Sequence, residues 1–469
     1  MAKFNWKDFL KRLAVIAIPV ALQNLLTTTA SMVDTMMVAP LGELSVGALG
    51  LCAQFSSLMF SCYWGFVGGG GLFFAQYWGA KDDDGINRSY GITLLFMMIV
   101  AVTFAILGIF APGLIMRLYT DKESIRQIGV QYLRIVGFAY ILQVLSMAMS
   151  VLLRSTERVR IPLYASIASV ATNLLLNWIL IFGRLGFPAL GIQGAAIATV
   201  SAAVVNVLVI YILSARIRYP YLFQIKSHFR WDRAFIGLYL KKCFPIICNE
   251  LLIGVGNMVI NITLGRQPEY VIAAVAVFRT LEGLIIGFFA GFSNAASVLV
   301  GKLVGAGDLE TAYERAKRLI YLCSLVIFSV GLMIFALHKP ILTAMSLSGE
   351  SYTAGTVILT IYLFVSLIRM GNWIHNDTYR SAGDAVYGTV LEIAFMYGML
   401  LPAVLLAGFY FHAPYWVVFL CCYIDEPIRY VLMQIHFYSG KWIKPVTEQG
   451  KAALDAFMEK RRKKTGVPL

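Results

Sequence analysis

The chain is built of long apolar stretches separated by short polar segments. A run of about 20 apolar residues with few charges is read as a transmembrane helix, because a helix of that length crosses the hydrocarbon core of a bilayer. A large soluble helical protein would need polar helix faces, and these runs lack them. The runs predict twelve membrane-spanning helices, at approximately 13–38, 48–78, 91–116, 129–152, 162–182, 190–213, 240–264, 270–301, 318–337, 355–380, 387–411 and 413–436.

Composition supports an all-α integral membrane protein. Of the 469 residues, 59% are hydrophobic and only 14% are charged, whereas soluble proteins carry roughly 25% charged residues. The seven cysteines lie in or at the ends of apolar segments without a metal-binding spacing. We therefore expect them to act as small hydrophobic residues.

Positive charge is concentrated on one side of the predicted membrane segments. If the amino terminus is cytoplasmic, six of the 39 Lys and Arg residues lie near the outer side and four lie within helices, which leaves 29 for the cytoplasmic side. This bias predicts a multi-pass protein of the cytoplasmic (plasma) membrane with both termini in the cytoplasm. It also explains the net charge of +14 without a nucleic-acid partner. The basic tail, Lys460–Lys464, faces either anionic lipid or nothing specific.

Three short patterns recur in the same order in the two halves of the chain. The pairs are IPVALQN with FPIICNE, QYWGAKD with KLVGAGD, and LRSTERV with YRSAGDA. In the second pair we interpret the glycine as a helix stop and the aspartate as the cap of the next helix. The repeats indicate two pseudo-symmetric six-helix lobes with the same orientation, an arrangement that suits a transporter with alternating access. The predicted divisions are an amino-terminal lobe, 1–213, a cytoplasmic linker, 214–239, a carboxy-terminal lobe, 240–440, and a basic cytoplasmic tail, 441–469.

Together these features resemble the MATE (multidrug and toxin extrusion) family of the wider flippase superfamily. Besides the GAKD and GAGD pair, the resemblance rests on Pro19 and on the segments VDTMMVAPLGELSVGALG, LRSTERVRIPLYASI, NLLLNWILIFG and GIQGAAIATVS. It covers roughly residues 10–440. The resemblance implies twelve helices in two lobes that form a V-shaped cavity, and export driven by the entry of H⁺ or Na⁺.

A single carboxylate, Asp34, interrupts the first apolar segment. An ionised Asp at membrane depth costs at least ~2.5 kcal/mol and is usually a working residue. Asn24, Thr27, Ser31 and Asp34 follow helical spacing and share one face, which must point into protein or a water-filled cavity. We expect the first three to contribute to substrate binding. The alternative is that these polar groups only lock helices together through hydrogen bonds.

Further polar residues of the first half suit a cation. Asn173 and Asn177 share a face of the fifth segment, and Thr199 lies in the sixth. A carboxylate with amide and hydroxyl oxygens is a donor set for a hard cation, and a desolvated carboxylate can instead carry a proton. The resemblance implies a coupling role for the positions of Asp34, Asn173, Asn177 and Thr199. Some family members have a second acid at the position of Asn177. A lone carboxylate favours H⁺ or Na⁺ over a divalent ion, and we expect no other cofactor.

The second half carries more charge within its predicted helices. Arg279 and Glu282 lie three residues apart and can pair on one helix. The alternative interpretation is a set of internal salt bridges, which we expect for Arg380 and Asp384. Arg429 either pairs with the neighbouring acids or contacts a ligand. The candidate substrate-binding residues are Glu250, Asn257, Arg279, Glu282, Arg369, Trp373, His375 and Asp377.

These residues predict a secondary antiporter and not an enzyme. No ATP-binding motif is present, and Asp34 has no acid partner for catalysis in its half. Acids with aromatic residues suit organic cations, whereas Arg279 and Arg369 suit zwitterions or anions. We expect a monomer that exports small cationic or zwitterionic organic compounds. The alternatives are a flippase for a lipid-linked precursor and an exporter of a polar or anionic metabolite.

Overall fold

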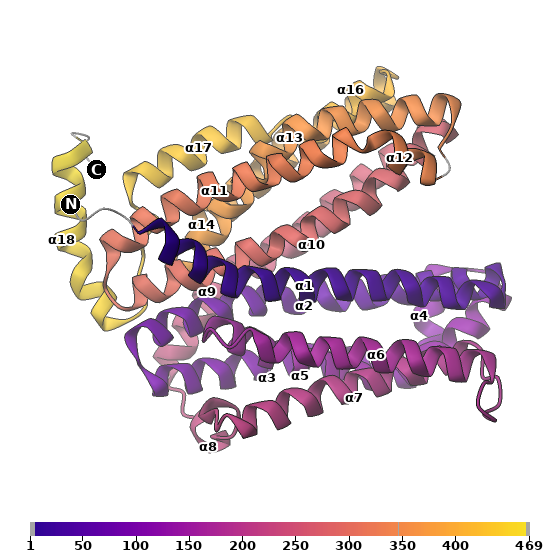
Figure 1. Ribbon diagram of the computed structural model, residues 1–469, viewed down its shortest axis with the longest axis horizontal. Helices are drawn as coiled ribbons and strands as arrows, with labels where there is room; N and C mark the ends of the chain where they lie inside the picture. Colours follow the sequence, from indigo (N-terminus) through magenta and orange to yellow (C-terminus); the bar gives the residue numbers. More distant parts are fainter. Residues whose placement is uncertain (1–4, 346, 466–469) are drawn as a thin grey trace. The chain divides into compact units, whose positions relative to one another are not determined.

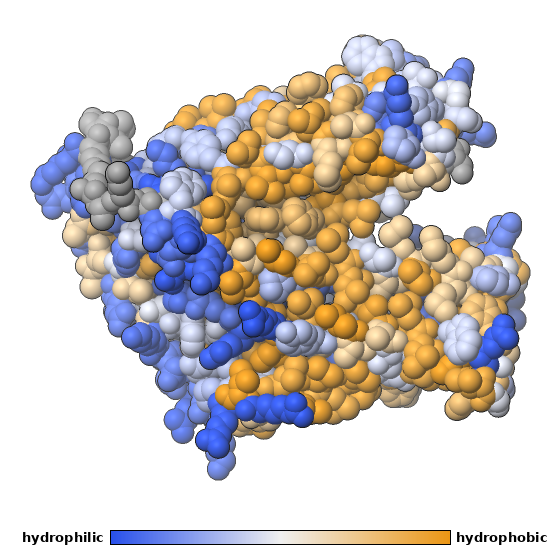
Figure 2. Space-filling model, viewed as in Figure 1, coloured by the Kyte–Doolittle hydropathy of each residue, from blue (hydrophilic) through white to orange (hydrophobic). Residues whose placement is uncertain are grey.

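The computed structural model describes residues 5–345 and 347–465, and apart from one β-bridge its regular elements are helices. Eleven helices in the described residues are long and apolar enough to cross a membrane. On the face seen in Figure 2, hydrophobic side chains cover the lengths of the helices, and hydrophilic ones gather at their ends. The predicted all-α membrane fold is confirmed.

The chain divides into two compact units, each described by itself. The amino-terminal unit contains Ile18–Phe74 and Asp82–Leu240. In it α6 packs along α7, and α5 contacts both α3 and α7 (Figure 1). Its helices, of which α1, α2 and α9 are shared with the other unit, are α1 (Trp6–Val38), α2 (Glu43–Ala80), α3 (Asp83–Phe110), α4 (Pro112–Tyr119), α5 (Glu123–Ser155), α6 (Arg160–Phe182), α7 (Ile192–Arg216), α8 (Ile225–His228) and α9 (Arg233–Leu264), with the short 3₁₀ turns η1 (Ala39–Leu41) and η2 (Pro220–Leu222).

The segment predicted as a linker, 214–239, is packed within the amino-terminal unit. Its short helix α8 lies on α3. The approach is so close that a Cβ atom at Gly91 would lie 1.9 Å from the carbonyl oxygen of His228. The segment therefore belongs structurally to the helices that precede it.

The carboxy-terminal unit contains the described part of Met1–Ala17, with Ala75–Lys81 and Lys241–Leu469. Its centre is α13, which packs against α10, α11, α14 and α17. Its further helices are α10 (Glu269–Gly305), α11 (Leu309–Ala336), α12 (His338–Ala344), α13 (Gly349–Ser381), α14 (Ala385–Phe395), α15 (Leu401–Leu405), α16 (Tyr415–Cys421), α17 (Glu426–Ser439) and α18 (Glu448–Thr465), with the π-helical stretches η3 (Met396–Leu400) and η4 (Leu406–Tyr410).

The last two predicted spans are irregular. The eleventh contains η3 and η4, and π-helical turns within an α-helix are frequent at functional sites. The twelfth, 413–436, is not one continuous helix, because it breaks into α16 and α17 around residues 422–425. Pro427 starts α17 and has no N–H to continue a preceding helix, so a break just before it is expected.

The repeated GAKD and GAGD patterns end helices as predicted. Asp82 caps α3 by accepting a hydrogen bond from the Gly85 N–H at 2.8 Å, and Asp308 caps α11 in the same way. The glycines have an additional role. A Cβ at Gly79 would lie 1.8 Å from the carbonyl oxygen of Lys302, and one at Gly305 would lie 1.9 Å from that of Gln76. The ends of α2 and α10 therefore cross with their backbones in contact, which only glycine permits.

The predicted tail, 441–469, is anchored to the carboxy-terminal unit over its described part. The N–H of Val446 donates to Oε1 of Gln76 at 2.8 Å, and Nε2 of Gln76 donates to the Ser381 carbonyl at 2.9 Å. Farther along, the guanidinium of Arg461 lies over the Tyr313 ring. Residues 466–469 and the side chain of Lys464 lie outside the described residues.

Candidate functional site

The amino-terminal unit brings Asp34 of α1 against two amides of α6. Nδ2 of Asn177 donates to Oδ1 of Asp34 at 2.6 Å and to Oδ1 of Asn173 at 3.2 Å. Both asparagines are buried, which agrees with their predicted common face. Oδ1 of Asn177 is buried without a hydrogen-bond partner among the described residues. Buried polar atoms are nearly always paired, so this oxygen needs an explanation.

Thr199 connects to this group through Tyr132 of α5, which the sequence did not single out. The Thr199 hydroxyl donates to the Ala195 carbonyl at 3.0 Å, and the Tyr132 hydroxyl hydrogen-bonds to Thr199. Tyr132 is also close enough to Asp34 to interact with its charge. A tyrosine in an apolar segment is too common to be recognised as part of a site without the fold.

An apolar cluster closes one side of the Asp34 group. It contains Val38, Ile181, Ile192 and Ala195, with Tyr132 packed against it. Val38 lies one helical turn beyond Asp34, and Ile181 lies one turn beyond Asn177. Where apolar side chains replace water beside a carboxylate, its electrostatic interactions are strengthened.

The rest of the predicted stripe on α1 is separate from these contacts. Thr27 and Ser31 are exposed, Asn24 is half-buried, and the Thr27 hydroxyl donates to the Gln23 carbonyl of its own helix. Gln23, which was not predicted, joins α1 to α6 through a hydrogen bond from Nε2 to the Ser166 hydroxyl at 3.0 Å. The helical spacing on α1 thus identified one residue that reaches the α6 amides, Asp34.

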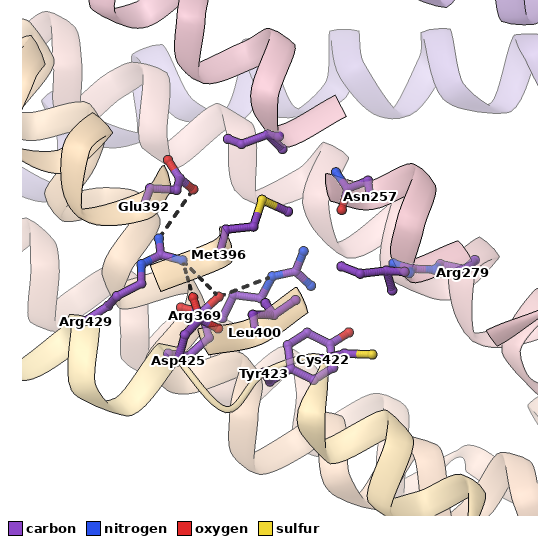
Figure 3. A pocket seen from close by; sticks show the side chains of 13 residues that line it. Asn257, Arg279, Arg369, Glu392, Met396, Leu400, Cys422, Tyr423, Asp425 and Arg429 are labelled. Atoms are coloured by element: carbon purple, nitrogen blue, oxygen red, sulfur yellow. Dashed lines mark hydrogen bonds and ion pairs between the residues drawn. The ribbon is translucent and has the colours of Figure 1, made fainter. Parts of the chain in front are cut away.

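The carboxy-terminal unit contains a cavity of about 120 Å³ (Figure 3). Its walls combine charged side chains of both signs with apolar ones. The lining residues are Ile253, Asn257, Ile260, Arg279, Arg369, Glu392, Met396, Leu400, Cys422, Tyr423, Asp425, Glu426 and Arg429.

Two arginines on one side of the cavity share a carboxylate. Nη1 of Arg279 lies 2.7 Å from Oε2 of Glu282, which confirms the pairing predicted from their spacing. Nη1 of Arg369, from α13, bonds to the other oxygen of the same carboxylate. Glu282 is only 3% exposed. Its single negative charge thus faces two guanidinium groups.

On the other side, Arg429 is surrounded by three acids. Its guanidinium lies 3.0 Å from Asp425, 3.3 Å from Glu392 and 3.9 Å from Glu426. The pairing with the neighbouring acids, left open from the sequence, is therefore present. Glu392 of α14 was missed, because its partner lies on another helix and nothing in the local sequence marks it.

Five predicted residues of this unit do not line the cavity: Glu282, described above, and the four that follow. Glu250 pairs with Arg380 at 3.3 Å. Asp377 accepts a hydrogen bond from the side chain of Trp373. His375 is completely buried, and its Nδ1 lies 2.6 Å from the carbonyl oxygen of Gly371 in its own helix.

The expected salt bridges near the helix ends exist with different partners. Arg380 binds Glu250, whereas Asp384 lies 2.9 Å from both His436 and Lys444. Burial alone would raise the pKa of Asp384, but the hydrogen bonds from His436 and Lys444 outweigh burial and bring the pKa below its ordinary value. This cluster joins the start of α14 to α17 and the tail.

Comparison with known proteins places these two sites in a familiar fold. A family model described as MatE matches residues 19–179 and 245–404. A probable multidrug resistance protein, YoeA of Bacillus subtilis, is 24% identical in an alignment that covers 85% of this chain and 87% of the YoeA chain. A probable multidrug resistance protein, NorM of Rhizobium meliloti, is 24% identical over 76% of each chain.

Solved structures agree with the architecture. An outward-facing multidrug resistance transporter of the MATE family has a TM-score of 0.79 at 19% identity, covering 92% of this chain and 96% of its own. A MOP superfamily transporter from Pyrococcus furiosus, described as having a binding pocket of reverse polarity, has a TM-score of 0.79 at 20% identity, covering 92% and 96%. The predicted fold of twelve helices in two lobes is confirmed.

Proposed function

This chain belongs to the MatE family, and from that premise we propose that it is a secondary antiporter that exports small organic compounds against H⁺ or Na⁺. Relatives named as probable multidrug resistance proteins support export of cationic or zwitterionic compounds. A polar or anionic metabolite stays an alternative substrate. We place the protein in the cytoplasmic membrane with both termini inside, because 29 Lys and Arg residues lie on that side. We further propose that it acts as a monomer.

The contact between Asp34 and Asn177 carries the proposal. It joins a carboxylate at membrane depth to neutral amides, and no salt bridge to Asp34 is present among residues 5–345 and 347–465. The unpaired Oδ1 of Asn177 and Oδ1 of Asn173 supply the oxygen atoms that Na⁺ requires, and Thr199 supplies a hydroxyl. A proton on Asp34 would neutralise the same charge. These groups can therefore hold one monovalent ion, either Na⁺ among the oxygen atoms or H⁺ on Asp34.

Coupling follows if the ion and the substrate favour different conformations. A ligand shifts such an equilibrium only by the difference between its affinities for the two states. Ion binding changes the charge at Asp34 by one unit, and that change alters which conformation the polar group on α1 and α6 prefers. The apolar cluster near Asp34 increases the electrostatic energy of this charge change, because apolar side chains screen charge less than water does.

Efflux from proteoliposomes tests this function. The purified chain is reconstituted, ethidium is trapped inside as a model organic cation, and Na⁺ and pH gradients are imposed separately. We expect Asp34→Asn to abolish gradient-driven efflux while the protein stays monodisperse. Asp8→Asn is the matched control, because Asp8 is an exposed acid on the same helix, paired with Arg12. Normal uphill efflux by Asp34→Asn would show that the coupling ion binds elsewhere.

A further inference from the structure

The cavity of the carboxy-terminal unit has two ends of opposite charge. At one end Arg279 and Arg369 share the single carboxylate of Glu282, so positive charge is in excess. At the other end Arg429 lies among Asp425, Glu392 and Glu426. Arg369 also lies 4.0 Å from Glu426, but three acids still face two arginines there, so negative charge is in excess. Figure 3 shows Arg279 with Asn257 on one side and Glu392 with Arg429 on the opposite side.

Two buried polar atoms of the cavity wall lack partners among the described residues. They are Nε of Arg429, a donor, and Oδ1 of Asp425, an acceptor. Arg429 is 7% exposed and Asp425 is not exposed, so bulk water does not satisfy them. Both atoms are also closed to a water-sized probe, so a ligand in the cavity would contact other atoms of the charged side chains.

A purely structural role explains this arrangement less well. Charges buried only for stability are often replaceable by apolar residues at no loss, because their desolvation offsets their attraction. Here the charged side chains line a cavity, with Arg279 on one side of it and Glu392 on the opposite side (Figure 3). A lone organic cation would meet Arg279 and Arg369, and a lone anion would meet three carboxylates. Each would be repelled at one end.

We propose that this cavity binds a small zwitterion, a molecule of amino-acid size with one carboxylate and one ammonium group. The carboxylate lies toward Arg279 and Arg369, and the ammonium lies toward Glu392 and Asp425. A volume of about 120 Å³ lies below the roughly 300–1,000 Å³ of typical ligand pockets, which favours a small ligand. The assignment rests on the proposed transport function and names the substrate class for this unit.

Direct binding to the purified full-length chain tests the assignment independently of transport. The probe is radiolabelled L-serine, and the competitors are serinol, which keeps the ammonium but lacks the carboxylate, and L-glycerate, which keeps the carboxylate but lacks the ammonium. We expect unlabelled serine to compete at least about tenfold better than either, since each analogue loses one charge-assisted contact. Equal competition by serinol and serine overturns the proposal. So does a failure of all three small zwitterions tested, serine, β-alanine and glycine betaine, to bind.

Two variants make opposite predictions and so separate selectivity from misfolding. Glu392→Gln keeps side-chain hydrogen bonding but removes a negative charge, so it should reduce the difference in affinity between serine and glycerate. Arg279→Gln removes a positive charge, so it should reduce the difference in affinity between serine and serinol. Glu314→Gln, an exposed acid on α11, is the control and should leave both differences unchanged. Unchanged differences in the first two variants, with monodisperse protein, contradict the assignment.

A final comparison distinguishes failure of this proposal from failure of the transport mechanism. Serine binding and gradient-driven efflux are therefore measured on the same set of variants: Glu392→Gln and Arg279→Gln report on the cavity of the carboxy-terminal unit, and Asp34→Asn reports on ion coupling in the other unit. If Asp34→Asn pumps normally while serine selectivity holds, the coupling site is wrong and the zwitterion site stands. If coupling requires Asp34 but serine does not bind, the cavity assignment alone is lost.

Discussion

Replacement of Gly305 by alanine tests the backbone contact between α2 and α10 most directly. A Cβ at this position would lie 1.9 Å from the carbonyl oxygen of Gln76 and 2.5 Å from its carbonyl carbon. Carbon atoms pack best at about 3.5–4.0 Å, so the new methyl group must displace the neighbour by more than about 1 Å. The obstacle is backbone rather than a flexible side chain. Gln76 cannot simply move away, because it also binds Ser381 and Val446.

The magnitude follows from a comparison within the same helix. Overpacking a well-filled contact costs about 1–3 kcal/mol or more, and a backbone obstacle places Gly305→Ala at the upper end. At Gly283, also on α10, no atom lies within 4 Å of the place that a Cβ would occupy. There, alanine removes the helix penalty of glycine and stabilises by up to about 1 kcal/mol. The two variants should therefore differ by about 4 kcal/mol in free energy of unfolding.

The assay is thermal unfolding of the purified chain in detergent, followed by loss of the monodisperse peak in size-exclusion chromatography. Gly305→Ala should unfold at a clearly lower temperature than the parent chain, and Gly283→Ala at the same or a higher one. Gly79→Ala should behave like Gly305→Ala, because its Cβ would meet the Lys302 carbonyl at 1.8 Å. If Gly305→Ala is as stable as Gly283→Ala, the helices do not cross where we describe them.

Three shorter predictions concern individual polar groups. The pKa of Asp384 lies below its ordinary value, so its ionised form stabilises the fold above the unfolded pKa of about 3.9, and this stabilisation is lost as pH falls below that value. In thermal unfolding measured over a series of pH values, Asp384→Asn should lose less stability at acid pH than the parent chain. Glu282→Gln should destabilise by about 3–5 kcal/mol, because it leaves two guanidinium groups without their shared anion, and Glu314→Gln should be neutral in the same unfolding assay. Asp82→Ala should cost about 1 kcal/mol in chemical unfolding through loss of the α3 cap.

Features that depend on local sequence could be predicted. The length of the apolar runs determined where helices form, since a span must match the bilayer. Helical spacing placed Asn173 and Asn177 on one face and paired Arg279 with Glu282, because residues three or four apart meet on a helix surface. The repeated aspartates were recognised as caps from their position after a glycine.

Contacts between distant segments could not be predicted. Arg380 lies 130 residues from Glu250, and Arg429 lies 37 from Glu392, so no local pattern links either pair. Hydropathy also treats the last segment as one run, although the helix breaks before Pro427. The repeated glycine was interpreted only as a helix stop, because its crossing partner becomes visible only when α2 and α10 are placed together.

The duplicated units hold charge differently, and this difference decides which carboxylate can exchange an ion. Glu282 is buried and held by two partly exposed arginines, so loss of its charge would leave two neighbouring cations without their shared anion, at a cost of up to several kcal/mol. Asp34 is held by neutral amide groups, and a change in its charge leaves no uncompensated partner. An ion cycle needs a group that can gain and lose charge at small cost. On that argument Asp34 is the better coupling group, and the compensated charges of the carboxy-terminal unit are better suited to recognising a dipolar ligand.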